Sequence, residues 1–427
     1  MDEMNRRRQE RLQRQKARLQ QERRTRIRLL IALGVLILCG ILILAFSLSS
    51  RNQQPEDTVP STQPQETETT APPQTTLPLE GETVIHFAAA GDLNITDNVV
   101  AAGGINFDYT QTFMDVLPLL SGANLTALNL EGNVCGAPYG KDSAPQQLLN
   151  ALKAAGVDML QVANSKSINR GVAGLNATVQ NVRASGIACV GAVVEGETPG
   201  AYVIRYVNGV KVAVVAFTKG MDGMSMPVGS EEQVNLLYTD YATTYKKVNE
   251  KGITSLLRKV SDEEPDIIIA LLHWGSEYSD IHSESQEKVK KLLLEQGVDV
   301  IIGSHPHFVQ EIEYNETTGQ LVAYSLGDFF GDADRSGTAY SVILDLEITK
   351  DNTTGVTKVT GYEYTPIYTI TDDAGLLRVV RLESAIAGYE AGRIGRVSEE
   401  SYNDMIRGLE RIKQRVAPET EEKKESK

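Results

Sequence analysis

Short apolar runs alternate with segments of helical periodicity between residues 84 and 302, and this alternation limits the possible folds more than any other feature. The apolar runs are 84–90, 125–130, 159–163, 210–217, 267–273 and 298–302. The helical segments are 145–155, 175–185, 243–260 and 285–295. Such alternation is typical of a largely parallel sheet with helices on its faces. We therefore predict an α/β fold for this part of the chain.

The sequence becomes strand-rich after His307. The runs 309–313, 321–326, 339–348 and 356–370 are strand-like, and Asn-Glu-Thr-Thr-Gly and Asn-Thr-Thr-Gly favour hairpin connections between them. Two sheets packed face to face, with helices outside, accommodate both halves in one α/β (α+β) domain, which we assign to residues 82–371. We expect residues 372–427 to form a charged helical tail, with the part beyond Gly392 outside the core.

The amino-terminal region predicts a membrane anchor. Residues 29–48 are apolar and uncharged, and twenty helical residues span about 30 Å, one hydrocarbon thickness. A cleavable signal peptide is the alternative, but its apolar core is usually about 7 to 15 residues long. Residues 1–28 carry eleven Lys and Arg against four Asp and Glu, a net charge of +7 that places this segment in the cytoplasm. We therefore predict a single-pass protein of the cell membrane whose main domain is extracellular.

Charge and composition characterise the chain beyond the predicted anchor. Residues 49–81 are rich in Thr and Pro and lack aromatic residues, which predicts a disordered stalk. The formal net charge of −14, with +7 in the first 28 residues, leaves −21 for the remainder. Such an excess of acidic residues argues against nucleic acid as the main partner. Cys135 and Cys189 would form a disulfide only if their Cα atoms lie within about 7 Å, which the sequence leaves open.

Polar residues recur where the apolar runs end. They are Asp92, Asn129 and Glu131, Asn164, His273 and Glu277, and His305 and His307. The carboxyl ends of parallel strands meet at one edge of a sheet, and His305 and His307 would face the same way if the segment around Pro306 is extended. Carboxylates with imidazoles suit Mn, Zn or Fe, and two such ions can activate a bridging water. Turn chemistry explains each residue alone, but together they favour a metal site.

Five motifs occur in a characteristic order. They are Ala-Ala-Gly-Asp92, Asn129-Leu-Glu131, His273-Trp-Gly-Ser-Glu277, Gly303-Ser-His-Pro-His307 with Gln310, and Tyr324-Ser-Leu-Gly-Asp-Phe329. The set resembles the bacterial capsule synthesis protein family of the CapA (poly-γ-glutamate biosynthesis) type, which is similar to calcineurin-like metallophosphoesterases. This resemblance implies a four-layer αββα sandwich with one or two divalent ions. The implied metal positions are Asp92, Glu131, His273, His305 and His307.

The resemblance also implies a biological role, and one motif of this chain departs from the family pattern. The implied role is in making, exporting or retaining poly-γ-glutamate or a related anionic envelope polymer, alongside other membrane proteins of capsule synthesis. Where the family typically has Asn-Asn-His followed by Asp, this chain has Asn164-Ser165-Lys166 followed by Asn169. A lysine offers only donors and cannot replace a neutral imidazole ligand. Asp328 also stands where Asn is usual.

Two functions of different classes fit these residues. In the first, the protein is an enzyme in which a metal-bound water attacks a phosphoester or amide, with Asn164 and Lys166 as candidate catalytic residues. In the second, a degenerate site binds an anionic polymer without turnover. The candidate anion-binding or substrate-binding residues are Lys166, Arg170, Asn129 and Glu277. Lys166 and Arg170 could equally be a pair in a surface loop.

Overall fold

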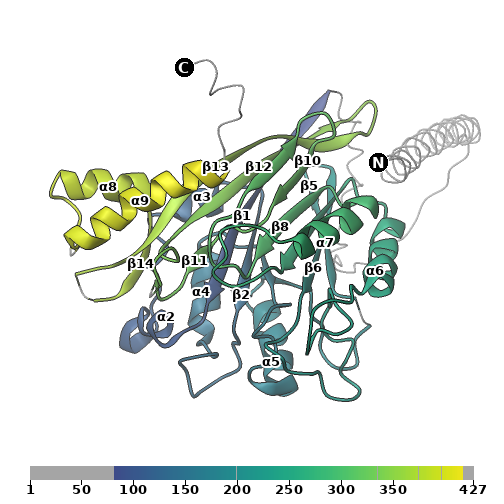
Figure 1. Cartoon of the computed structure of the whole chain (residues 1–427), viewed down its shortest axis with the longest axis horizontal. Coiled ribbons are helices and arrows are strands. Elements are labelled where there is room, and N and C mark those ends of the chain that lie inside the picture. Colours follow the sequence, from purple (N-terminus) through teal and green to yellow (C-terminus); the bar gives the residue numbers. More distant parts are fainter. Residues whose placement is uncertain (1–80, 199, 334, 374, 396, 417–427) are drawn as a thin grey trace, which may run out of the picture.

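The computed structural model describes residues 81–198, 200–333, 335–373, 375–395 and 397–416, and these residues form two sheets with helices around them (Figure 1). The predicted membrane segment 29–48 and nearly all of the predicted stalk 49–81 lie outside these ranges. Within the ranges, no helix combines the length and the apolar character that a membrane crossing needs.

The first sheet contains strands from both the beginning and the end of the described chain. Its strands run in the order β14-β13-β12-β1-β2-β3-β4, and β11 pairs with β1. The bounds are β1 (Glu82–Asn94), β2 (Leu125–Glu131), β3 (Met159–Gln161), β4 (Ala188–Val190), β11 (Asp328–Phe330), β12 (Tyr340–Asp351), β13 (Thr357–Thr371) and β14 (Leu377–Arg381). The strands β1 to β4 are parallel, whereas β12, β13 and β14 are antiparallel.

The second sheet is parallel at its centre and antiparallel at both edges. Its strands run in the order β5-β6-β7-β8-β10-β9. The bounds are β5 (Tyr202–Val207), β6 (Val210–Thr218), β7 (Ile267–His273), β8 (Val300–Ser304), β9 (Ile312–Asn315) and β10 (Gln320–Ala323). Parallel pairing of β6, β7, β8 and β10 brings the carboxyl ends of these strands to one edge.

Successive side chains of a strand point to opposite faces of the sheet, so the buried apolar residues form separate clusters on the two faces. Residues such as Phe87 and Ile269 lie in a cluster between the sheets, since both sheets contribute to it. Neighbouring positions on β2 and β3 pack instead with the helices α4 (Gln146–Ala154) and α5 (Gly171–Ala184). Positions such as Ile268 pack with α6 (Glu250–Asp262) and α7 (Glu284–Glu295). The shorter helices are α2 (Asp97–Ala101), the 3-10 helix Gly104–Asn106 and α3 (Leu117–Ser121).

The prediction of a mixed α/β fold with two sheets is confirmed. The predicted helix 243–260 begins later, at Glu250, because the residues before it form a turn around Asp240. The Asp240 carboxylate accepts the main-chain N–H groups of Lys246 and Lys247, both at 3.0 Å, and Asn249 then caps the helix. Cys135 and Cys189 are free thiols, so the disulfide that the sequence left open is not formed.

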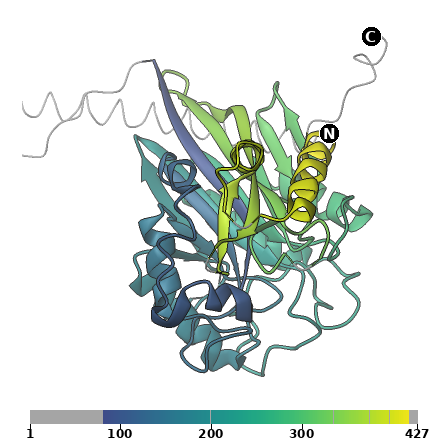
Figure 2. The same cartoon turned by 90° about the vertical axis from the view of Figure 1, so that its left-hand side faces the viewer.

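The carboxy-terminal region corrects the expectation that it lies outside the core. Residues 377–381 form β14, and the helices α8 (Leu382–Glu390) and α9 (Glu399–Val416) lie against β13 and its neighbours (Figure 2). Met405, Ile412 and Val416 are buried in the same cluster that fills the space between the sheets. Spacings of seven and four residues place these three side chains on one apolar helix face, and the many charged residues of this region obscure that face in the sequence.

We expect Ile412→Ala to destabilise the domain, because Ile412 is fully buried in that cluster. Truncating a buried Ile to Ala costs about 2–5 kcal/mol of unfolding free energy. Lys413→Ala is the matched control, since Lys413 is exposed on the same helix and its truncation should change stability by less than about 0.5 kcal/mol. Urea unfolding of both variants measures the difference. Equal stabilities would show that α9 does not belong to the core.

Candidate metal centre

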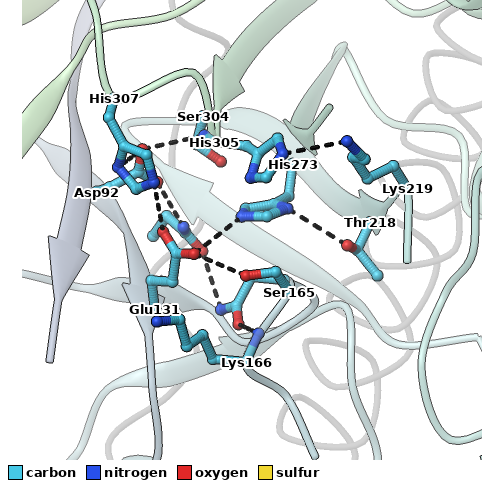
Figure 3. A network of polar contacts seen from close by, with 12 residues as sticks. Asp92, Glu131, Ser165, Lys166, Thr218, Lys219, His273, Ser304, His305 and His307 are labelled. Carbon is cyan, nitrogen blue, oxygen red and sulfur yellow. Dashed lines mark hydrogen bonds and ion pairs between the residues drawn. The ribbon is translucent and has the colours of Figure 1, made fainter. Parts of the chain in front are cut away.

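The carboxyl ends of strands from both sheets meet at one place, and five predicted residues come together there (Figure 3). Asp92 lies on β1, Glu131 ends β2, His273 ends β7, and His305 and His307 directly follow β8. Each of the five is at most 3% exposed. Side chains that are distant in the sequence therefore form one buried polar cluster. The structure places Asp328, the first residue of β11, beside them.

Close backbone approaches hold the strand ends in position. A Cβ atom on Gly91 would lie 1.7 Å from the Gly327 oxygen, and one on Gly303 would lie 1.9 Å from the Tyr324 oxygen. Only glycine fits at these two positions. The expected extended segment around Pro306 is not formed, because His305 and His307 have φ values of 92° and 58°. This strained turn still brings both imidazoles to the cluster.

Amide and hydroxyl groups orient the two central carboxylates. Asp92 accepts a hydrogen bond from Asn129 Nδ2 at 2.6 Å and another from the His305 main-chain N–H at 3.0 Å. Asn164 in turn donates from Nδ2 to Asn129 Oδ1 at 3.1 Å. Glu131 Oε1 accepts from the Ser165 hydroxyl at 2.7 Å. Asn129, which Asn164 supports, therefore positions the Asp92 carboxylate, and Ser165 of the altered motif positions the Glu131 carboxylate.

Hydrogen bonds also define the state of the imidazole rings. The Thr218 hydroxyl donates to the Gly220 oxygen, so its oxygen accepts from His273 Nδ1 at 3.4 Å. The lone pair of His273 is then on Nε2, which lies 3.5 Å from Glu131 Oε1. A lone pair that faces a carboxylate is repelled unless a cation lies between them. His307 places Nδ1 2.6 Å from Asp328 Oδ1 and Nε2 4.0 Å from Glu131 Oε2.

Several atoms in this cluster have no hydrogen-bond partner within the described part of the chain. They are Glu131 Oε2, His273 Nε2 and His305 Nδ1, all buried. Buried polar atoms in proteins are normally paired, so such atoms require an explanation. A carboxylate oxygen and an imidazole lone pair at this spacing suit a borderline divalent ion such as Zn, Mn or Fe. The residues present therefore fit the divalent metal that the sequence predicts.

The ionisation of the cluster supports the same interpretation. Burial, together with the negative charge of Glu131, raises the pKa of Asp92 to about 8. Burial lowers the pKa of His273 and His305. Burial alone would lower the pKa of His307 too, but the carboxylates of Asp328 and Glu131 hold that pKa well above its usual value. Without a metal, protons on Asp92 and His307 therefore balance the buried negative charge.

The other predicted residues differ in how near they lie to the cluster. Glu277 lines a cavity of about 290 Å³ beside the cluster, together with Ser165 and His305. Lys166 lies beside the cluster in Figure 3, and its ammonium group is 4.0 Å from Asp142 Oδ1. Arg170 is not brought to the cluster, since its guanidinium donates to main-chain oxygens of the loop at residues 138–141.

Among the residues of this site that were not predicted from the sequence, two contact the histidines that follow β8. Asp328 contacts His307, and Lys219 contacts His305. Lys219 directly follows β6, the fourth apolar run, which is the run to which no polar end residue was assigned. Lys219 is the charged residue that follows the end of that run, as the predicted site residues follow the ends of the others. Burial lowers the pKa of Lys219, while the nearby Glu277 and Asp222 carboxylates oppose this shift.

We expect the affinity for a divalent ion to rise between pH 6 and pH 8, because an ion must displace the Asp92 proton below a pKa of about 8. Each displaced proton changes the affinity about tenfold per pH unit. Calorimetric titration of the metal-free protein with Mn²⁺ measures this dependence, and Glu131→Gln corrects for ions bound elsewhere. Equal affinities at both pH values would contradict the raised pKa of Asp92.

Comparison with known proteins gives the family. The bacterial capsule synthesis protein PGA_cap model matches residues 86–333. Capsule biosynthesis protein CapA of Bacillus anthracis is 27% identical over 51% of this chain and 50% of that protein. PGA biosynthesis protein CapA of Bacillus subtilis (strain 168) is 26% identical over 60% of this chain and 66% of that protein. The chain therefore spans between half and two thirds of the length of these two relatives. A novel phosphatase structure from Mycoplasma pneumoniae overlaps 67% of this chain and 94% of that one, with 14% identity and a TM-score of 0.41. The family predicted from the motifs is therefore confirmed, and the chain belongs to the bacterial capsule synthesis protein family PGA_cap.

Proposed function

We propose that this protein acts in the synthesis, export or retention of a capsule polymer such as poly-γ-glutamate, through a metal and anion site on an extracellular domain. Residues 29–48 would anchor it in the membrane, with residues 1–28 in the cytoplasm and residues 49–81 as the stalk. The observation that carries this proposal is the buried carboxylate–imidazole cluster, with its unpaired atoms, inside the region that matches the family. Two relatives are named for capsule and PGA biosynthesis, which supports the polymer class.

The chain's own residues divide the work of such a site. Asp92, Glu131 and His273 would hold the ion, with His307 beside them, while Asn129 keeps the Asp92 carboxylate in place. A bound divalent ion would supply a concentrated positive charge that attracts carboxylates or polarises an amide or phosphoryl oxygen. The adjacent cavity leaves room for one end or one unit of a polymer next to the cluster. Other membrane proteins of capsule synthesis would be partners of the anchored chain.

The altered Asn164-Ser165-Lys166 motif favours binding over turnover. The chain has five histidines, and His86 and His282 pair with Asp345 and Glu287 away from the cluster. The remaining three lie in the cluster itself, so no imidazole outside the cluster is available as a general acid. Lys166 stands where the family has a histidine, and Asp142 is the carboxylate within 4.0 Å of its ammonium group.

Metal-dependent hydrolysis of a phosphoester or amide in the envelope polymer is the alternative, and Asp222 is the residue that favours it. Asp222 lines the cavity beside the cluster. Burial and the charge of Glu131 raise its pKa, so its carboxyl group is better able to hold a proton for a leaving group. This alternative gives Asp222 the role that an imidazole would otherwise have.

Incubation of the purified full chain with poly-γ-glutamate and Mn²⁺ or Zn²⁺ separates the two functions. We expect the polymer to be bound and to keep its length, as measured by size-exclusion chromatography with light scattering. Shortening of the polymer that is lost in Asp222→Asn would establish the hydrolase instead. Glu410→Gln is the control for the substitution, because Glu410 is exposed on α9.

We expect Glu131→Gln to abolish polymer retention in a producing cell whose own gene is deleted. The neutral amide removes the negative charge from the centre of the cluster, and with it most of the attraction for a divalent ion. Cell-associated polymer should fall to the level of the deletion strain, while the variant protein remains in the membrane fraction in normal amount. Glu410→Gln should restore polymer like the wild type. Normal polymer with Glu131→Gln would refute a role for the metal centre, and wild-type protein in the soluble fraction would refute the anchor.

A further inference from the structure

Lys219 lies against the metal centre and is held there by several contacts. Its ammonium nitrogen is 3.2 Å from His305 Nε2 and donates to the Gly275 oxygen at 2.8 Å. It also lies 4.8 Å from the centre of the Tyr245 ring, a cation–π contact. Figure 3 shows the lysine reaching the His305 ring from the side opposite Glu131 and Asp92. A positive charge is thus built into the protein next to a candidate ligand.

The contact with Lys219 determines what the His305 ring can do. An ammonium group has donors only, so His305 Nε2 must be the acceptor. The proton of a neutral His305 ring then lies on Nδ1, the buried atom that has no partner in the described part of the chain. Neither nitrogen of His305 offers a lone pair to an ion in this arrangement. His273 differs, because its Nδ1 is bonded to Thr218 and its Nε2 lone pair is free.

The side chains at the centre form three overlapping groups that could each hold an ion. The groups are Glu131–His305–His307, Asp92–His307–Asp328 and Asp92–Glu131–His273. The first group cannot bind an ion while Lys219 donates to His305. The second cannot bind one while His307 Nδ1 makes its hydrogen bond of 2.6 Å with Asp328. The third group retains unpaired atoms on Glu131 and His273. A single ion position is therefore ready for occupation.

We propose that Lys219 is an internal cation of the metal centre, which takes the place of a second ion beside His305 and limits the centre to one ion. A second dication at this place would be repelled by the ammonium group and would lack the lone pair of His305. Lys219 and one ion together offset the buried charges of Asp92, Glu131 and Asp328. This inference rests on the proposed metal centre and adds the residue that sets its ion count.

Counting ions in Lys219 variants of the purified full chain tests the proposal. After saturation with Mn²⁺ and removal of free ion, mass spectrometry of the metal should give one ion per chain for the wild type. Lys219→Met keeps the length of the side chain but frees His305 Nε2, so its count should rise to two. Lys219→Arg keeps the positive charge and should remain at one. Lys413→Met is the matched control, because Lys413 is exposed on α9 and lies neither in the cluster nor in the lining of its cavity within the described residues, and it should also remain at one.

The variant His305→Ala provides a second measurement that does not depend on the folding of Lys219→Met. Because His305 is not a ligand while Lys219 occupies it, His305→Ala should keep the single ion with an affinity within about threefold of the wild type. The double variant Lys219→Met with His305→Ala should return from two ions to one. Loss of the ion in His305→Ala would overturn the proposal, as would a wild-type count of two or an unchanged count in Lys219→Met.

A metal centre without a role for Lys219 gives a different ion count from a chain that has no metal centre. A wild-type chain with two ions leaves the proposed metal centre in place and removes only the role of Lys219. A chain that binds no ion, in the wild type and in all variants, overturns both. Circular dichroism melting curves identify any variant whose ion count is lost through unfolding, and such a variant is replaced by the His305→Ala comparison.

Discussion

The burial of negative charge is the constraint on which the site and much of its surroundings depend. Asp92, Glu131 and Asp328 are all buried at the meeting point of the two sheets. A buried carboxylate is costly unless a proton, a partner or a metal compensates it. In the protein without a metal, the raised pKa values of Asp92 and His307 provide that compensation through protons. A divalent ion would replace those protons and would also pair the buried atoms of Glu131 and His273 that protons leave without a partner.

The fold meets this constraint by bringing rigid backbone to the cluster. The residues lie at strand ends, and glycine at Gly91 and Gly303 permits approaches that a Cβ atom would block. The strained φ value of His305 lets its main-chain N–H donate to Asp92 while its ring meets Lys219. Backbone strain of this kind persists only where surrounding structure enforces it. The strained backbone at His305 thus lowers the stability of the fold somewhat, but it holds the polar groups in place.

The sequence was sufficient to predict the site residues that follow regular strands. The run 267–273 coincides with β7, and the alternating first half together with the strand-rich second half predicted the two-sheet α/β fold. Asp92 and Glu131 were predicted because parallel strands share one edge, and the structure brings them together. Lys219 follows a strand like the predicted residues, but it was missed because only possible metal ligands were sought at the strand ends, and an ammonium group is not a ligand. The packing of α9 was missed because its apolar face is narrow among many charges.

The location of a bound ion tests the central claim most directly. A crystal of the protein grown with Zn²⁺ would show the ion by its anomalous scattering at the zinc absorption edge. We predict one peak at about 2.0–2.2 Å from Glu131 Oε2 and His273 Nε2, on the side of His307 and away from Lys219. An empty cluster in crystals whose protein carries zinc elsewhere would contradict the account, because the buried atoms of Glu131 and His273 would then have no cation to explain them.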